Sequence, residues 1–203
     1  TLGEGGMLVA RDPEWAQIVP MLRHNGHRPS PVDRPDYWIP AMTDVTLPRL
    51  KGRALWPINC CLGEVSCALG TQLLDRVDEM NAQRRARALA VIDALADFPE
   101  LVFHREASLR HSYYLLAAHV QKGLRDRFIR RMAEHHGIQC VVQYYPLNRY
   151  PLYRDLGFGE AVVPSTDAFF DNMVSLPFSH LLTDVQIKQI IAATRETVEF
   201  LRR

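Results

Sequence analysis

The stretch that decides the fold is Asn59-Cys60-Cys61-Leu62-Gly63-Glu64-Val65-Ser66-Cys67-Ala68-Leu69-Gly70. Its apolar residues Leu62, Val65 and Leu69 recur with the spacing of one helix face, so we expect a helix to begin here. Asn59 stands just ahead of that helix start. An asparagine in this place either caps the helix or reaches outward to a ligand, and the residues alone leave both interpretations open.

Residues 25–57, on the N-terminal side of this stretch, contain many prolines. Because proline interrupts both helices and sheets, we expect an extended connection that runs over the surface. A connection of this length within a compact protein usually carries a function or packs on a partner. On the other side of the stretch, the helical pattern continues to Leu95, and Pro99 ends it.

The remaining segments predict a mixture of helices and strands. Short apolar or alternating runs indicate strands at residues 7–10, 101–103, 112–120 and 138–143. Helical spacing and start signals indicate helices at residues 13–22, 124–136 and 166–173, and a terminal helix that follows Thr183. Thr183 and Gln186 have the spacing of a capping box, and Gly137 is a typical C-terminal helix stop.

The composition is that of a globular α/β chain with no strong charge bias. Among its 203 residues, Lys plus Arg number 24 and Asp plus Glu number 23, which gives no basic excess for nucleic acid or an anionic membrane. We find no apolar run of about 20 residues and no signal peptide, so we expect a soluble, cytoplasmic protein. The four cysteines lack zinc or redox spacing, and we expect reduced, buried thiols.

Two clusters of chemically active side chains have structural interpretations. His24 and His27 are three residues apart, and His135 and His136 are adjacent, but neither pair has an acidic residue at a zinc-type offset. We therefore expect no metal site. The arginines of residues 84–87 could bind phosphate, although on a helix such a cluster more often forms a solvated face.

Two motifs, in order and at a fixed spacing, indicate a family. The first is Gly3-Glu4-Gly5-Gly6, and the second runs from Asn59 to Glu64. Both resemble motifs of the DegT/DnrJ/EryC1/StrS family of sugar aminotransferases, which use pyridoxal phosphate. The resemblance continues through His111-Ser112-Tyr113-Tyr114, Val142-Gln143-Tyr144-Tyr145-Pro146-Leu147, Tyr150-Pro151-Leu152-Tyr153 and Leu176-Pro177-Phe178. The chain departs from the family pattern where Cys60-Cys61 replaces Tyr-Arg and where Gln143 stands in place of a frequent histidine.

This resemblance implies the C-terminal part of an aspartate-aminotransferase-like protein of fold type I. Residues 1–70 are then the tail of the large cofactor-binding domain with its Pro-rich connection. Residues 71–203 form a small α/β domain with a largely antiparallel sheet. The implied reaction moves an amino group from an amino acid, usually glutamate, to a keto or aldehyde sugar. The implied assembly is a homodimer with shared active sites, in which Asn59 reaches the cofactor phosphate of the other subunit.

The loop at residues 144–151 is the candidate substrate contact. Its hydroxyl, amide and guanidinium groups, which include Tyr144, Asn148 and Arg149, suit a hydroxylated or anionic ligand. Such groups also occur in loops whose aromatic rings merely pack. We therefore treat substrate binding at this loop as a hypothesis.

The cofactor lysine of the family has no counterpart in this sequence. The chain has three lysines, Lys51, Lys122 and Lys188, and none has the apolar or charge-tuned surroundings of a nucleophilic lysine. We therefore assign no catalytic residue and expect the 203 residues alone to be inactive. Two alternatives remain open. The chain is either a catalytically inert partner or fragment, or part of a related sugar dehydratase in which histidine replaces the lysine.

Overall fold

The computed structural model describes residues 2–27, 47, 49–106 and 111–203. The chain divides into two compact units, Thr1–Asp75 and Arg76–Arg203. The boundary predicted from the sequence, between residues 70 and 71, lies five residues before this division. Most of the Pro-rich connection at residues 25–57 lies outside the described residues.

In the described part of the first unit the helices are α1 (Pro13–Leu22) and α2 (Glu64–Leu74). The Asp12 side chain caps α1 by accepting a hydrogen bond from the Glu14 amide at 2.8 Å. Pro20 lies inside α1 without ending it. The strand predicted at residues 7–10 is wrong. Met7, Leu8 and Val9 are exposed, and within the described residues no strand pairs with them.

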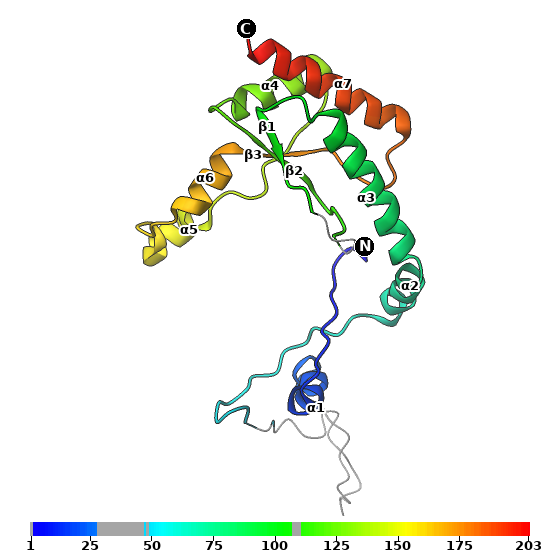
Figure 1. The fold of residues 1–203 in the computed structure, drawn as a ribbon. Coiled ribbons are helices and arrows are strands. Elements are labelled where there is room, and N and C mark those ends of the chain that lie inside the picture. The colour runs from blue at the N-terminus through cyan, green and yellow to red at the C-terminus, as the bar shows by residue number, and fades with distance from the viewer. Residues whose placement is uncertain (1, 28–46, 48, 107–110) are drawn as a thin grey trace, which may run out of the picture. The chain divides into compact units, whose positions relative to one another are not determined.

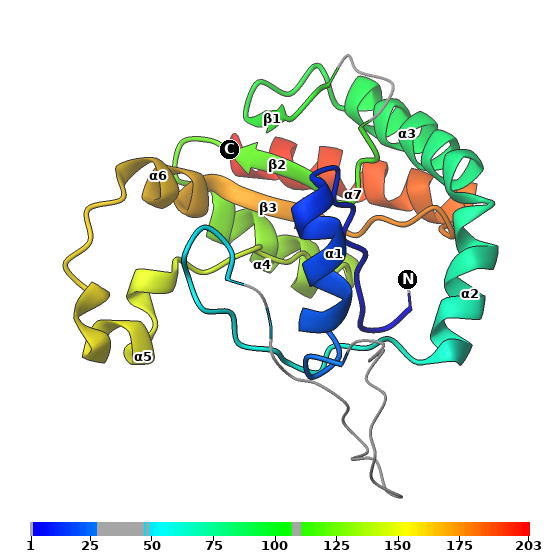
Figure 2. The same ribbon diagram turned by 90° about the horizontal axis from the view of Figure 1, so that it is seen from below.

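The second unit is built on a short antiparallel sheet. Its strands are β1 (Leu101–Phe103), β2 (Leu116–Val120) and β3 (Met173–Leu176), in the order β1-β2-β3 (Figures 1 and 2). Leu101 pairs with Val120, and Leu116 pairs with Leu176. The predicted largely antiparallel sheet is therefore present in the described part of this unit.

Helices pack against this sheet and against each other. They are α3 (Val77–Ala94), α4 (Arg125–His136), α6 (Pro164–Asn172) and α7 (Asp184–Leu201). Helix α4 ends at Gly137, whose φ of 65° is left-handed, and α7 begins with the predicted capping box of Thr183 and Gln186. Figure 1 shows α4 and α7 side by side. The core between helices and sheet includes Val91, Leu95, Leu116, Phe128, Met132, Val174, Ile190 and Val198.

The strand predicted at residues 138–143 is wrong, and the strand predicted at residues 112–120 is confirmed only for residues 116–120. Residues 138–143 form only an isolated bridge, from Val141 to Ser175, and residues 112–115 precede β2 without joining it, with Tyr113 at a φ of 45°. The partner that completes the sheet is β3, all of whose side chains are buried. A buried run of four residues has no alternating pattern, so the sequence gives no periodic signal for this strand.

The arginine cluster of α3 holds a neighbouring loop and is not a solvated face. Arg84 contacts Nδ1 of His180 at 3.2 Å, and Arg87 donates to the carbonyl oxygen of the same residue. Arg85 donates to the carbonyl oxygen of Glu106 at 3.3 Å. These contacts hold α3 to the segment between β3 and α7 and to the segment that follows β1, and they leave the phosphate-binding interpretation without support.

Glu100 is a buried carboxylate, only 5% exposed, and its partners come from two distant segments. Arg202 donates to both carboxylate oxygens, at 3.1 and 2.8 Å, and Lys122 Nζ lies 3.6 Å away. The hydrogen bonds from Arg202 hold the pKa of Glu100 at about 2, below its ordinary 4.5, although burial acts in the opposite direction. The charged form of Glu100 is therefore the one that the fold stabilises.

Arg202→Met should lower the stability at neutral pH and flatten its dependence on acid. A depressed pKa contributes stability that is complete above the unfolded value of 4.5 and is lost as the pH falls toward about 2. Without Arg202 the burial of Glu100 raises its pKa, so less stability remains to be lost in that window. Urea unfolding at about pH 6 and about pH 3 measures the difference. Arg203→Met is the matched control, and an equal acid response in both variants would contradict the assignment.

Among the described residues, no helix combines the length and apolar character that crossing a bilayer requires.

Candidate functional site

The end of α1 fixes the backbone around Asn59. The Ile58 amide donates to the carbonyl oxygen of Leu22 at 2.9 Å, and the Asn25 amide donates to Ile58 at 3.0 Å. On the other side of Asn59, the Cys60 amide donates to Arg23 at 2.9 Å. Asn59 thus sits in a short antiparallel bridge, opposite His24, and its position does not depend on α2.

The side chain of Asn59 does not cap α2. The N-cap of α2 is Gly63, which has no side chain, and the Asn59 Oδ1 instead accepts a hydrogen bond from the Cys61 amide at 3.3 Å. The capping interpretation is therefore wrong. Asn59 is exposed, and within the described part of the chain its Nδ2 group has no partner. An exposed amide donor on a fixed backbone suits a phosphate oxygen.

The glycine segment Gly3–Gly6 lies against α2 in the same unit. A Cβ atom at Gly5, whose φ is 142°, would meet a methyl carbon of Leu62 at 3.2 Å. A Cβ atom at Gly70 would meet a methyl carbon of Leu2 at 3.3 Å. A side chain at either position would therefore be crowded, and the φ of Gly5 favours glycine as well.

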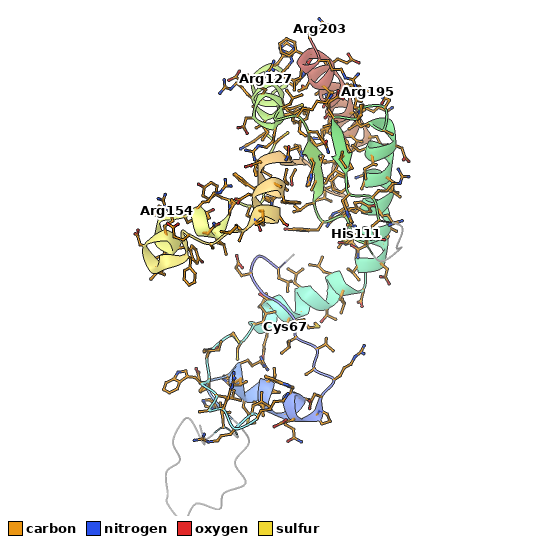
Figure 3. All side chains as sticks on the ribbon, turned by 60° about the vertical axis from the view of Figure 1, so that its left-hand side comes forward. Cys67, His111, Arg127, Arg154, Arg195 and Arg203 are labelled. Carbon is orange, nitrogen blue, oxygen red and sulfur yellow. The ribbon has the colours of Figure 1, made fainter. Side chains whose placement is uncertain are left out.

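The three cysteines close to Asn59 in the sequence are exposed, although the sequence predicted buried thiols. Cys60, Cys61 and Cys67 are free and exposed, and only Cys140 is buried as expected. Burial raises the pKa of the Cys140 thiol to about 12, so this thiol is protonated at neutral pH. Figure 3 places Cys67 on α2. The expectation that the cysteines are buried is therefore wrong for the three residues near Asn59.

The second unit carries a polar cavity at the loop predicted to contact substrate. After Pro146 the chain forms a 3₁₀ turn at Leu147–Arg149, the short helix α5 (Pro151–Tyr153) and a wide turn at Arg154–Phe158. They line a solvent-open cavity of about 670 Å³. Figure 3 places Arg154 on this segment. The lining residues are Tyr145, Asn148, Arg149, Pro151, Arg154, Asp155, Gly157, Gly159 and Glu160.

The predicted contact residues occupy different positions around this cavity. Asn148 lines it and donates to the carbonyl oxygen of Ala161 at 3.2 Å. Arg149 also lines it, but its guanidinium pairs with Asp167 and lies 3.8 Å from Asp171. Tyr144 is exposed and is not part of the lining. Arg149 is thus held by carboxylates, and it can orient the loop as well as meet a ligand.

Sequence reasoning missed the charged residues on the far side of the cavity. Arg154, Asp155 and Glu160 follow the loop in sequence, and the turn with Gly157 at a φ of 87° folds them back toward Asn148. The only signal in the sequence was the glycines at positions 157 and 159, which permit such a turn. Together these groups offer both donors and acceptors to a hydroxylated molecule.

The amino-acid pattern on which this geometry rests is that of a known family. Residues 1–195 match the sequence profile of the DegT/DnrJ/EryC1/StrS aminotransferase family. The chain belongs to this family. The match includes the glycine segment Gly3–Gly6, the bridge at Asn59 and the polar cavity, so the resemblance predicted from short motifs is confirmed.

Relatives in the DegT/DnrJ/EryC1/StrS family include sugar aminotransferases. The dTDP-3-amino-3,4,6-trideoxy-alpha-D-glucose transaminase of Micromonospora megalomicea is 28% identical over 97% of this chain and 48% of its own length. The chain spans about half the length of the curated relatives it matches.

Solved structures of this family show the same fold. Helicobacter pylori PseC, an aminotransferase of pseudaminic acid biosynthesis, superposes with a TM-score of 0.73 at 20% identity, over 94% of this chain and 47% of that chain. A Streptococcus pneumoniae protein named as a sugar aminotransferase, solved in its PLP form, superposes with a TM-score of 0.73 at 22% identity, over 95% of this chain and 45% of its own. The predicted fold type I architecture is therefore confirmed.

Proposed function

We propose that this chain is part of a pyridoxal-phosphate-dependent sugar aminotransferase. Its substrates are an amino acid, with glutamate as the expected donor, and a keto or aldehyde sugar that is often nucleotide-linked. The product is an amino sugar for a surface polysaccharide or an antibiotic. The observation that carries this proposal is the family match over residues 1–195, which includes the fixed, exposed amide of Asn59.

The reaction exchanges an amine and a carbonyl oxygen between two molecules. The carbon that bears nitrogen in the amino acid is oxidised to a ketone, and the carbonyl carbon of the sugar is reduced to an amine, so no external oxidant is needed. Pyridoxal phosphate, when bound, supplies the electron sink for this chemistry. The residues of this chain fit the phosphate of the cofactor, because Asn59 offers a donor to a phosphate oxygen. They do not supply the amine that holds the cofactor ring, because no described lysine is buried.

We place the Asn59 donor in a homodimer. In that arrangement Asn59 reaches the cofactor phosphate of the other subunit, as the family resemblance implies. The near balance of charge, 24 basic against 23 acidic residues, supports small-molecule partners over nucleic acid. A cytoplasmic location agrees with this chemistry, since its substrates are intracellular metabolites.

The polar cavity at residues 145–160 is the proposed sugar subsite. Asn148 and Tyr145 offer an amide and a phenol, while Arg154, Asp155 and Glu160 add charges of both signs. Sugar hydroxyls both donate and accept hydrogen bonds, so a mixed lining suits them. Tyr144 and Arg149 belong to the same proposed subsite as flanking residues, and Arg149 also holds the loop through Asp167.

In the full-length enzyme, Asn148→Ala should raise KM for the sugar by about tenfold with a smaller change in kcat. A contact away from the reacting carbon stabilises the bound substrate and the transition state alike. The measurement is steady-state formation of 2-oxoglutarate from glutamate, with the keto sugar varied. Tyr144→Phe, which removes one exposed hydroxyl, should have a smaller effect in the same direction.

Asn172→Ala is the matched control for this test, because the Asn172 side chain donates to its own helix at Ala168 and does not line the cavity. Unchanged KM values for Asn148→Ala and Tyr144→Phe would remove the loop from the substrate site. Formation of no amino sugar with any keto or aldehyde sugar would favour the inert partner over the transaminase.

A further inference from the structure

The C-terminus of α4 and the middle of α7 bring three possible metal ligands together. His135 and His136 end α4, and Glu196 lies on α7. The His136 Nε2 is 2.8 Å from the Glu196 Oε2, and the two imidazole rings have their centroids 4.8 Å apart. One ligand atom from each of the three residues lies within 4.8 Å of the other two.

We propose that His135, His136 and Glu196 form a binding site for one divalent transition-metal ion, such as Zn²⁺, that links α4 to α7. Two imidazole nitrogens and one carboxylate oxygen are a ligand set that zinc accepts. The fourth tetrahedral position is left for water. The sequence could not predict this site, because Glu196 is 60 residues from His136 and meets it only through the packing of the two helices.

The ligands need only small movements to surround an ion. A zinc ion about 2.0 to 2.2 Å from each ligand atom holds those atoms somewhat more than 3 Å apart. His136 would exchange its contact with Glu196 for a bond to the metal. His135 is exposed and free to rotate its ring toward its neighbour. A solvent-open groove reaches the cluster at His135, and its other lining residues are Arg127, Arg130, Arg131, Glu134, Phe200 and Leu201.

Charges around the cluster act in both directions. Arg131 and His136 both contact the Glu196 carboxylate, which supplies the negative charge of the cluster. Arg131 itself, which donates to both oxygens of Glu196 and stacks 3.6 Å from the Phe200 ring centroid, repels a cation, as do Arg127 and Arg130. The carbonyl end of α4 attracts one. We therefore expect affinity in the micromolar range, weaker than a structural zinc site.

Zinc titration of the full chain by calorimetry tests the site. All variants are made in a protein that carries Cys60→Ser, Cys61→Ser and Cys67→Ser, because exposed thiols also bind zinc. We expect one equivalent of zinc to bind. His136→Ala and Glu196→Gln should each weaken binding by about tenfold or more, since either change removes one of three ligands. Arg131→Met should strengthen binding by removing the nearest positive charge.

Two variants keep the test decisive. His119→Ala is the matched control. His119 packs its ring on Phe169 and is not one of the three proposed ligands, so this variant should bind zinc as tightly as the protein without the substitution. His135 is exposed, so His135→Ala decides the question if Glu196→Gln fails to fold. Absence of binding at millimolar zinc, or equal affinity in His135→Ala, His136→Ala and the control, would overturn the proposal.

Discussion

Pyridoxal phosphate followed by borohydride should leave no lysine of this chain labelled stoichiometrically. The covalent link to the cofactor needs a neutral amine held against the aldehyde, in a pocket that excludes water. Lys51, Lys122 and Lys188 are all exposed. Lys122 lies 3.6 Å from the Glu100 carboxylate, so its amine is engaged in an ion pair at the surface. A complete aminotransferase should show one lysine labelled almost completely, and this chain should show none.

The measurement is mass spectrometry of peptides after equimolar cofactor and reduction. Weak, similar labelling of all three lysines is the expected background for surface amines. Near-complete labelling of one lysine, abolished by its arginine variant, would show that this chain carries its own cofactor lysine. The expected result means that the cofactor lysine of the proposed enzyme lies outside these 203 residues.

Asn59→Ala should weaken pyridoxal phosphate retention by tens of fold in the full-length enzyme. A hydrogen bond to a charged phosphate oxygen contributes about 1.5 to 3 kcal/mol, and about 1.4 kcal/mol corresponds to a factor of ten. Asn59 is exposed, so its loss should leave the fold intact. Absorbance titration of the apoenzyme with cofactor gives the dissociation constant, and thermal unfolding checks the fold.

Asn59→Asp separates the two roles of this side chain. Aspartate keeps the oxygen that accepts from the Cys61 amide, but it loses the Nδ2 donor and places a negative charge near the phosphate. If Asn59 holds the phosphate, the aspartate variant should bind cofactor at least as weakly as the alanine variant. If it retains cofactor like the parent protein, Asn59 only shapes the turn before α2.

Local signals account for the elements that were predicted correctly. Asp12-Pro13, Thr183 with Gln186, and Gly137 mark helix ends through hydrogen bonds and backbone angles that involve neighbouring residues only. The failed strands at residues 7–10 and 138–143 have suitable residues but lack a full pairing partner among the described residues. A strand exists only as part of a ladder, so its assignment depends on residues far away in the sequence.

The candidate sites divide in the same way. The motif around Asn59 and the loop with Asn148 were visible in the sequence, but the partners of their side chains were not. A local turn directs the Oδ1 of Asn59 to the Cys61 amide, and the packing of the loop against α6 pairs Arg149 with Asp167. Whether these residues bind cofactor and sugar stays a prediction until the variants are measured.

The sequence by itself indicated the family, several helix ends and the inventory of three lysines, because motif order, capping and residue inventory are properties of a linear chain. Only the tertiary structure decided that β3 completes the sheet, that residues 154–160 fold back to form a polar cavity, and that Glu196 meets His135 and His136. The sheet and the meeting of Glu196 with the two histidines depend on contacts between residues far apart in the chain, whereas the cavity depends on the chain reversal at Gly157. Such contacts form because helices and strands bury their apolar faces together, and the polar groups that this packing brings into contact leave no periodic signal in the sequence.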